Sequence, residues 1–338
     1  MHQELAQAQA QPVLQQGKYM PIAVGSLQQD STTDFDLYIR NRPGAPPMLY
    51  RKAGLPFSEE ACQRLLDRNI ATLYVSVADK VAYRRYVEAH IGDILSDDTI
   101  PMPERSHLLY DSAQEMVKDL LQDARAGDIM ERSGLMVEHM VAFMFRESSS
   151  FEHLMKVTSY DYYTYTHSVD VFVFSVALAQ RLGLKRDAVQ ALGQGALLHD
   201  IGKSLIDPEI LNCPGALSDE QWVIMRKHPE YGDELLREQG NVDSTIRDVV
   251  RHHHEKLSGK GYPDGQPRAE ISPEARIVAV GDVFSALTTN RPYKKAMGSF
   301  EALTLMKEKM AEDLDAQYFR VFVQLMAGPG RQLANKKR

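Results

Sequence analysis

Histidines gather in one stretch of this chain. Of 11 histidines among 338 residues, six fall between positions 167 and 254. These are His167, His199, His228, His252, His253 and His254. An isolated histidine is usually exposed or satisfied within a core, so one alone says little. Several of these stand beside a carboxylate or a proline, as His199 stands beside Asp200, and the cluster therefore indicates a metal site.

The pair His199–Asp200 closes an apolar run, ALLHDIGK, over residues 196–203. We expect a helix that runs into this pair and ends at Gly202. Neighbouring helical residues point about 100° apart, so the imidazole and the carboxylate can straddle one metal or a metal pair. Such ligands suit Fe, Mn, Ni, Zn or Co rather than Ca or Mg. A plain helix end would explain Lys203, but not a charged pair in an apolar setting.

Polar residues also interrupt other apolar stretches. His167 stands in THSVDVFVFSVALA and Asp282 in ARIVAVGDVFSAL. A carboxylate there is costly unless a cation or hydrogen bonds satisfy it, although a buried ion pair would do the same. Pro229 after His228 predicts a helix kink. The run 252–254 is hard to explain as a solvated face, although a histidine tract can bind metal adventitiously.

Hydrophobic patterning predicts the elements that carry these residues. Short apolar runs at 20–24, 35–39 and 73–77 predict strands, and helices are expected from Ser58 and over about 78–91. After Pro101 and Pro103, amphipathic helices are expected over 107–121, 128–145, 159–182, 186–198, 219–239, 245–254, 273–289 and 300–311. The predicted fold class is mainly α, with a small α+β domain preceding an all-helical domain.

The predicted domain limits follow from these elements. The α+β domain is expected over residues 18–100 and the helical domain over 101–328, with its core at 150–328. Residues 1–17 and 329–338 are expected to be a flexible tail and a basic tail.

Composition excludes several classes of protein. A net charge of −7 argues against a general binder of nucleic-acid polymers or anionic membranes. Cys62 and Cys213 are far apart and form no pair motif, which fits a reducing compartment. No apolar run reaches the roughly 18 residues of a membrane span, and residues 1–17 do not read as a secretory signal. We therefore expect a cytoplasmic protein.

The order of the motifs resembles a known family. Along the chain stand His167, HDIGK at 199–203, HP at 228–229, HHE at 253–255, GYP at 261–263, Asp282 and RPY at 291–293. This series resembles the HD-GYP subgroup of the HD phosphohydrolase superfamily over about residues 150–328. The resemblance implies an all-helical, HD-type metallohydrolase fold. It also implies a phosphodiesterase that hydrolyses cyclic di-GMP in bacterial second-messenger signalling.

The resemblance implies two divalent transition-metal ions, with Fe, Mn or Ni expected. The first would be held by His167, His199, Asp200 and Asp282. The second would be held by Asp200, as a bridge, and by His228, His253 and His254. Water between two such ions becomes hydroxide near neutral pH and attacks phosphorus in line. Asp200 and Lys203 are the expected catalytic residues.

The resemblance also implies where the substrate binds. Lys203, Arg291 and Lys294 would hold phosphate, and arginine suits bidentate contacts to it. Tyr262 of the GYP loop would lie beside the substrate, and that loop is linked in the family to partners such as GGDEF proteins. His252 has no assigned role and is expected to be exposed or to support a ligand.

Two positions depart from the family pattern. Tyr163 stands where some members carry a glutamate that helps to hold a third metal. We therefore expect two metals and, as in many two-metal members, the linear dinucleotide pGpG as the main product, with GMP as a further one. Ser258 replaces the usual Asp or Asn before the GYP loop, which removes no ligand.

Alternative functions stay open. The enzyme could act on another cyclic dinucleotide, such as cyclic GMP-AMP. A non-catalytic cyclic di-GMP sensor is the other class, against which the complete ligand set argues. The α+β domain is either regulatory or inert. The helices over 107–146 could mediate a homodimer, or simply pack on the helical core.

Overall fold

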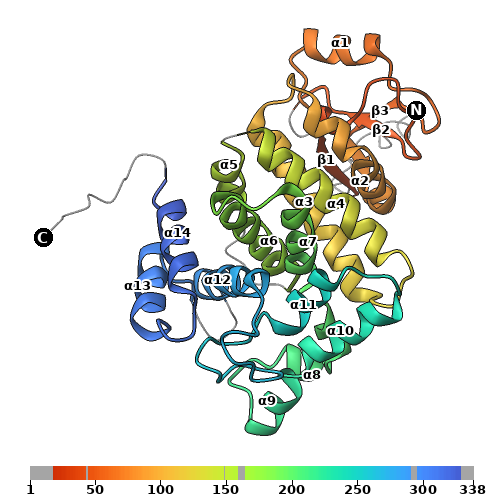
Figure 1. Cartoon of the computed structure of the whole chain (residues 1–338). Helices are drawn as coiled ribbons and strands as arrows, with labels where there is room; N and C mark the ends of the chain where they lie inside the picture. The colour runs from red at the N-terminus through yellow and green to blue at the C-terminus, as the bar shows by residue number, and fades with distance from the viewer. Residues whose placement is uncertain (1–17, 43–44, 148, 159–163, 291–294, 329–338) are drawn as a thin grey trace, which may run out of the picture. The chain divides into compact units, whose positions relative to one another are not determined.

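The computed structural model describes residues 18–42, 45–147, 149–158, 164–290 and 295–328. The chain divides into two compact units, Met1–Glu104 and Arg105–Arg338. Helices dominate the second unit and a small sheet lies in the first (Figure 1). The predicted fold class, mainly α, is confirmed.

The first unit contains a four-stranded antiparallel sheet in the order β1-β4-β2-β3. Its strands are β1 (Tyr19–Ala23), β2 (Leu37–Ile39), β3 (Met48–Arg51) and β4 (Thr72–Ser76). The patterning predicted all of them except β3. That strand lies at the edge of the sheet and has no buried residue, so its sequence lacks the alternation that marks a half-buried strand.

Two helices complete this unit, α1 (Glu59–Asp67) and α2 (Lys80–Ser96), with short 3₁₀ turns η1 (Val24–Ser26) and η2 (Val77–Asp79). Both helices were predicted, although α2 is longer than expected. Phe35 is fully buried and meets the rings of Tyr83 and Tyr86 edge-on, each at 5.7 Å between centroids. Such geometry is favourable for aromatic pairs, and it packs α2 against the segment that leads into β2.

Helices make up the second unit. They are α3 (Met102–Gln122), which starts just before it, α4 (Ile129–Arg146), α5 (Ser150–Val157), α6 (Thr164–Arg181), α7 (Arg186–Leu198), α8 (Pro208–Leu211), α9 (Asp219–Met225), α10 (His228–Glu238), α11 (Ser244–His252), α12 (Pro273–Thr288), α13 (Ser299–Lys309) and α14 (Ala316–Met326). A 3₁₀ segment, η3 (Ile201–Leu205), follows α7. None of the helices in the described ranges combines enough length and apolar character for a membrane crossing.

Some helix limits were predicted wrongly. The expected helix over 219–239 is two helices, α9 and α10, and Pro229 lies in the first turn of α10. Proline lacks the N–H that a helix interior needs, but it suits a first turn. Neither α5 nor α14 was predicted. In the expected helix over 159–182, the first five residues lie outside the described part of the chain.

Helix α6 forms the centre of the second unit. Its residues from Thr166 to Ala179 are all buried, and it packs against α7 and α12. A helix that is apolar on every side belongs in the middle of a core. This central position explains how polar side chains on α6 and α12 come to face each other in the interior.

Candidate metal centre

His167 on α6 faces Asp282 on α12. Its Nε2 lies 3.0 Å from Asp282 Oδ1, and its Nδ1 lies 2.9 Å from Ser285 Oγ. Gly281 permits this approach, because a Cβ there would lie only 2.9 Å from Ser175 Oγ. Both predicted residues are buried, and they lie within hydrogen-bonding distance of each other. Together they form one side of a buried polar centre.

The pair His199–Asp200 follows the end of α7 rather than lying within it. The helix ends at Leu198, so the expectation that it continues to Gly202 was wrong. Gly202 serves packing instead. A Cβ there would lie 2.0 Å from the carbonyl oxygen of His228 and 2.5 Å from the amide nitrogen of Gly232. The bare backbone lets η3 pack on α10, so that His228 Nε2 lies 3.2 Å from Asp200 Oδ1.

His253 and His254 complete the centre from the end of α11. His253 Nε2 lies 3.3 Å from His228 Nε2, and His254 Nδ1 lies 3.4 Å from Asp282 Oδ2. Ligand atoms lie within 4.8 Å of one another in each of three sets: His167 with His199 and Asp282, His199 with Asp200 and His253, and His228 with His253 and His254. The structure thus brings together all seven predicted metal ligands.

Three of these histidines are oriented in the same way. The Nδ1 atoms of His199, His228 and His253 donate to the carbonyl oxygens of Ala196, Met225 and Val250, at 2.8, 2.8 and 2.9 Å. Each acceptor is three residues upstream in the last turn of a helix, where carbonyls lack intrahelical partners. A carbonyl can only accept, so Nδ1 holds the proton and Nε2 presents a lone pair to the centre.

The unpaired atoms of the centre follow from this orientation. His199 Nε2 and Asp200 Oδ1 are buried without a hydrogen-bond partner. Asp200 Oδ1 lies close to His228 Nε2, yet that nitrogen has no proton to donate. Two nitrogen lone pairs also face each other between His228 and His253. Carboxylates and imidazoles arranged in this way fit divalent first-row ions.

Charge at the centre also suits cations. Burial opposes ionisation of Asp200 and Asp282, but neighbouring histidines, together with Lys203 beside Asp200, outweigh it and hold the pKa of both carboxyls well below the usual range. Burial and adjacent imidazoles lower the pKa of His253 well below normal, and burial lowers the pKa of His254 to about 3. Burial also opposes the charge of His199, but Asp200 and Asp282 raise its pKa. The centre therefore presents ionised carboxylates together with neutral imidazoles at His253 and His254, the protonation states that metal binding requires.

The predicted substrate residues are only partly described. Lys203 Nζ lies 2.5 Å from Asp200 Oδ2, so its ammonium is paired with the expected bridging carboxylate. The Tyr262 ring lies 4.7 Å from that of His254, and the Arg226 guanidinium lies 5.5 Å from its centroid. Burial raises the pKa of Tyr262, so its hydroxyl stays protonated. Arg291, Lys294 and Tyr163 lie outside the described residues.

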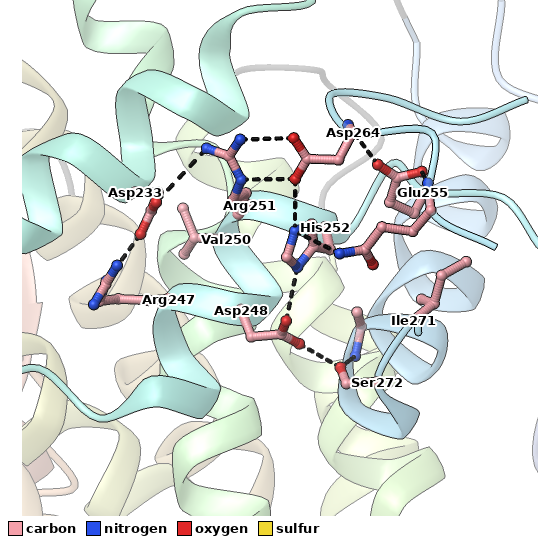
Figure 2. Close-up of polar contacts among 12 residues, drawn as sticks. Asp233, Arg247, Asp248, Val250, Arg251, His252, Glu255, Asp264, Ile271 and Ser272 are labelled. Atoms are coloured by element: carbon pink, nitrogen blue, oxygen red, sulfur yellow. Dashed lines mark hydrogen bonds and ion pairs between the residues drawn. The ribbon is translucent and has the colours of Figure 1, made fainter. Parts of the chain in front are cut away.

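His252 belongs to another polar network, which is shown in Figure 2. Its Nδ1 lies 2.7 Å from Asp248 Oδ1 and its Nε2 lies 3.0 Å from Asp264 Oδ2. Both ring nitrogens therefore face carboxylates, which favour the protonated imidazole with its two donors, and the side-chain amide nitrogen of Gln266 lies 3.1 Å from Nε2. Burial opposes this charge, but Asp248 and Asp264 raise the pKa of His252. The histidine that had no assigned role is thus a structural ion-pair member.

Glu255, the last residue of the HHE motif, also belongs to this network. Its carboxylate is buried and accepts from the backbone N–H groups of Asp264, Gly265 and Gln266 at 2.8, 2.9 and 3.0 Å (Figure 2). It therefore holds the segment that directly follows the GYP motif. The sequence pattern gave no role to Glu255 or Ser285, because their partners lie nine or more residues away along the chain.

Ser258, the residue that departs from the family pattern, has a partner of its own. It donates to Asp313 Oδ1 at 2.6 Å, and Lys256 Nζ lies 2.9 Å from the other oxygen of that carboxylate. The loop before the GYP motif is therefore anchored to the segment between α13 and α14.

Comparisons with known proteins fit this architecture. A family model described as an HD domain matches residues 91–318, more than half of the chain. The chain is similar to the cyclic di-GMP phosphodiesterase PA4108 of Pseudomonas aeruginosa, with 38% identity over 218 residues. It is also similar to the cyclic di-GMP phosphodiesterase response regulator RpfG of Xanthomonas campestris pv. campestris, with 41% identity over 130 residues, and to 3'3'-cGAMP-specific phosphodiesterase 3 of Vibrio cholerae, with 36% over 157.

The matches cover only part of each relative. They cover 64, 38 and 46% of this chain, and 52, 34 and 34% of the respective relatives. The chain thus spans about half of the first relative and a third of the others. Among solved structures, Bd1817, an HDG"Y"P protein from Bdellovibrio bacteriovorus, has a TM-score of 0.63 at 23% identity, over 92% of this chain and 100% of that one. That similarity establishes the fold.

Proposed function

Because this chain belongs to the HD domain family, as the resemblance predicted, we propose that it hydrolyses a cyclic dinucleotide, with cyclic di-GMP as the preferred substrate. The observation that carries the proposal is the buried centre in which Asp200 lies between two sets of histidines. A carboxylate in this position can bridge two ions. Activity, substrate and partners belong to the proposal, since the relatives are matched over only part of their length.

Bound metal ions would supply an ionised water at neutral pH and would stabilise charge on the phosphoryl oxygens. His167, His199, Asp200 and Asp282 would hold one ion. Asp200, His228, His253 and His254 would hold the other.

The remaining groups of the chain prepare this chemistry. Lys203 offsets the charge of Asp200 and restrains the oxygen that it contacts. The backbone carbonyls that accept from the Nδ1 atoms restrict three imidazoles to one orientation each. Tyr262 packs against His254 and forms an aromatic surface beside the centre, on which a guanine base could stack. We assign phosphate binding to Lys203, Arg291 and Lys294, as the resemblance implies.

Two cyclic dinucleotides fit this chemistry. Relatives named for cyclic di-GMP and for 3'3'-cGAMP are both similar to the chain. The longest of the matches described above, over 218 residues, is with a cyclic di-GMP phosphodiesterase, so we favour that substrate. We further propose two metal ions, of Fe, Mn or Ni, and pGpG as the main product. A cytoplasmic location, GGDEF-type partners and a homodimer through residues 107–146 also remain predictions.

The test is hydrolysis of cyclic di-GMP by purified protein that has been reconstituted anaerobically with Fe(II), Mn(II) or Ni(II). We expect metal-dependent pGpG that is lost in Asp200→Asn and kept in Asp219→Asn, a change at an exposed carboxylate of α9. Faster turnover of cyclic GMP-AMP would reassign the substrate. Binding of cyclic di-GMP without a product for any metal would identify a sensor instead.

The first unit is proposed to be regulatory, because it precedes the metal centre in the chain. Deletion of residues 1–100 should then change turnover or oligomeric state. Unchanged kinetics and unchanged mass in solution would show that this unit is inert.

A further inference from the structure

A hollow of about 560 Å³ lies in the first unit between the edge strand β3 and helix α1. Small-molecule sites commonly have volumes of about 300–1,000 Å³. The hollow is independent of the metal centre in sequence and in the residues that form it. Its charged side chains are positive, whereas the chain as a whole carries a net negative charge, and it has an apolar base.

Every charged side chain that lines the hollow is a cation. These are Arg51, Lys52, Arg64 and Arg68. No Asp or Glu lines it, although the chain as a whole carries a net charge of −7. Among the described residues, no carboxylate oxygen lies within ion-pairing distance of these four cations, whereas Arg237 in another surface hollow lies 2.8 Å from Asp233. Within the described part of the chain, the positive charge of the first hollow is therefore not compensated by an ion pair.

Two of these cations come from nearby positions of the chain. Arg64 lies on α1, and Arg68 lies in the turn that directly follows the end of this helix at Asp67. Both side chains line the hollow and are exposed. Like charges gathered in one place repel each other, and an anion between them would relieve this repulsion.

Apolar side chains form the rest of the hollow. Leu65 is fully buried at its base, while Leu49 and Leu55 are 47 and 50% exposed at its sides. Tyr50 also lines it, and its hydroxyl donates to the carbonyl of Ala61 at 3.2 Å, which occupies the polar end of the ring. A ligand that only carried charge would leave this surface in water.

We propose that the hollow binds a small organic phosphate with a planar body, of which a nucleotide is the representative. Arginine forks bind phosphate oxygens in pairs. Guanidinium planes and apolar side chains accept the face of a base. The lining residues include no carboxylate and no histidine, so binding at this site does not require a metal ion.

Independence from metal gives the test. Full-length protein would be treated with EDTA and titrated with GDP and ADP by isothermal calorimetry. We expect one site per chain, with affinity reduced at least tenfold in Arg64→Glu/Arg68→Glu. Affinity should stay unchanged in Lys80→Glu, which alters an exposed cation at the start of α2 outside the hollow. Unaltered thermal unfolding of the double variant, whose substituted side chains are exposed, establishes that the fold is intact.

The competitors separate the two parts of the site. Pyrophosphate should displace GDP only weakly and guanosine should not displace it, because each offers half of the interactions. No nucleotide binding in EDTA, or equal loss in Lys80→Glu, would overturn the proposal. Tighter binding of dodecanoate than of GDP would also overturn it, in favour of an acyl anion. None of these outcomes depends on hydrolysis at the metal centre, so the two proposals can fail separately.

Discussion

Two polar clusters meet at the end of α11, and consecutive histidines belong to different ones. His252 lies between the carboxylates of Asp248 and Asp264, and its pKa is raised although burial opposes this. His253 faces other imidazoles, and burial with those neighbours lowers its pKa. The pKa of one residue type is therefore shifted in opposite directions at adjacent positions. The partners that each ring meets decide the direction of the shift.

The difference shows what each cluster needs. The His252 network pairs cations with anions from the protein itself, so its charges are compensated within the protein, and Gln266 Oε1 is the atom of this network that is buried without a hydrogen-bond partner among the described residues. In the metal centre, by contrast, lone pairs face lone pairs and two buried atoms have no hydrogen-bond partner. A buried unsatisfied polar atom costs about 1–3 kcal/mol. Divalent cations would offset this cost, whereas the His252 network would gain nothing from them.

The largest expected effect follows from removing the bridging charge. Asp200→Asn should lower kcat/KM by more than the roughly 10–100-fold that changes to the supporting partners of metal ligands cause. The reason is that an amide cannot bridge two cations as a carboxylate does. His252→Gln should change kcat/KM by less than about tenfold, because it contacts no ligand atom. Steady-state hydrolysis of cyclic di-GMP measures both. Equal losses would mean that the two clusters are one functional unit.

A second prediction concerns stability. Mn(II) at a concentration 100 times its Kd should raise the free energy of unfolding by about 2.7 kcal/mol, because the ion binds the folded state only. Thermal unfolding with Mn(II) and with EDTA measures the shift. His252→Gln should retain it and His199→Ala should lose most of it. A shift that survived in His199→Ala would place the ion elsewhere.

A third buried carboxylate, that of Asp170, provides a test of how burial and neighbouring charges set the charge state of a carboxyl group. Asp170 is on α6, one turn after His167, and the hydroxyl of Tyr110 donates to it at 2.5 Å. Burial raises its pKa to about 8, although this hydrogen bond opposes the rise. None of the cations in the described ranges pairs with Asp170, so the group remains protonated where Asp200 and Asp282 are ionised.

The sign of the pH effect follows from this shift. An unfolded aspartate ionises near 3.8, so between about pH 4 and 8 the folded state binds more protons and stability falls as pH rises. The slope should approach about 1.4 kcal/mol per pH unit in the middle of this range. Asp170→Asn should remove that slope in urea unfolding of EDTA-treated protein. An unchanged slope would show that Asp170 is ionised when folded.

Four of the predicted metal ligands could be anticipated from the local sequence, because each is a polar residue in or beside an apolar helix. These are His167, Asp282 and the pair His199–Asp200. The roles of His228, His253 and His254 as ligands came from the family resemblance, because the helices beside them are polar. Strand β3 could not be anticipated, since an edge strand with no buried face has no periodic signal. Helix periodicity likewise did not reveal that Gly202 lies against the backbone of α10.

Roles that depend on long-range partners were also not accessible from sequence. His252 differs from His253 only through Asp248 and Asp264, and the latter lies in a loop 12 residues away. The pairing of Lys203 with Asp200 is local, at three residues. The sequence did not reveal this pairing, because it does not show where the ammonium points.

The smallest predicted effect concerns the junction of the two clusters. Glu255 follows the ligand His254, yet its carboxylate holds three backbone N–H groups after Tyr262. In Glu255→Gln one of these donors would meet an amide NH₂, at a cost of about 1 kcal/mol. If Tyr262 forms part of the substrate site, KM should rise about fivefold while kcat changes less than about twofold. Glu234→Gln, an exposed change on α10, is the matched control.

The division between KM and kcat distinguishes positioning from metal binding. Loss of a metal ligand lowers kcat and the metal content together, whereas a displaced loop weakens substrate binding and leaves the metal content unchanged. Metal analysis of Glu255→Gln should therefore give the wild-type stoichiometry. A fall in kcat together with a loss of metal would instead show that Glu255 supports the metal centre. Glu255 would then belong with His253 and His254 rather than with the His252 network.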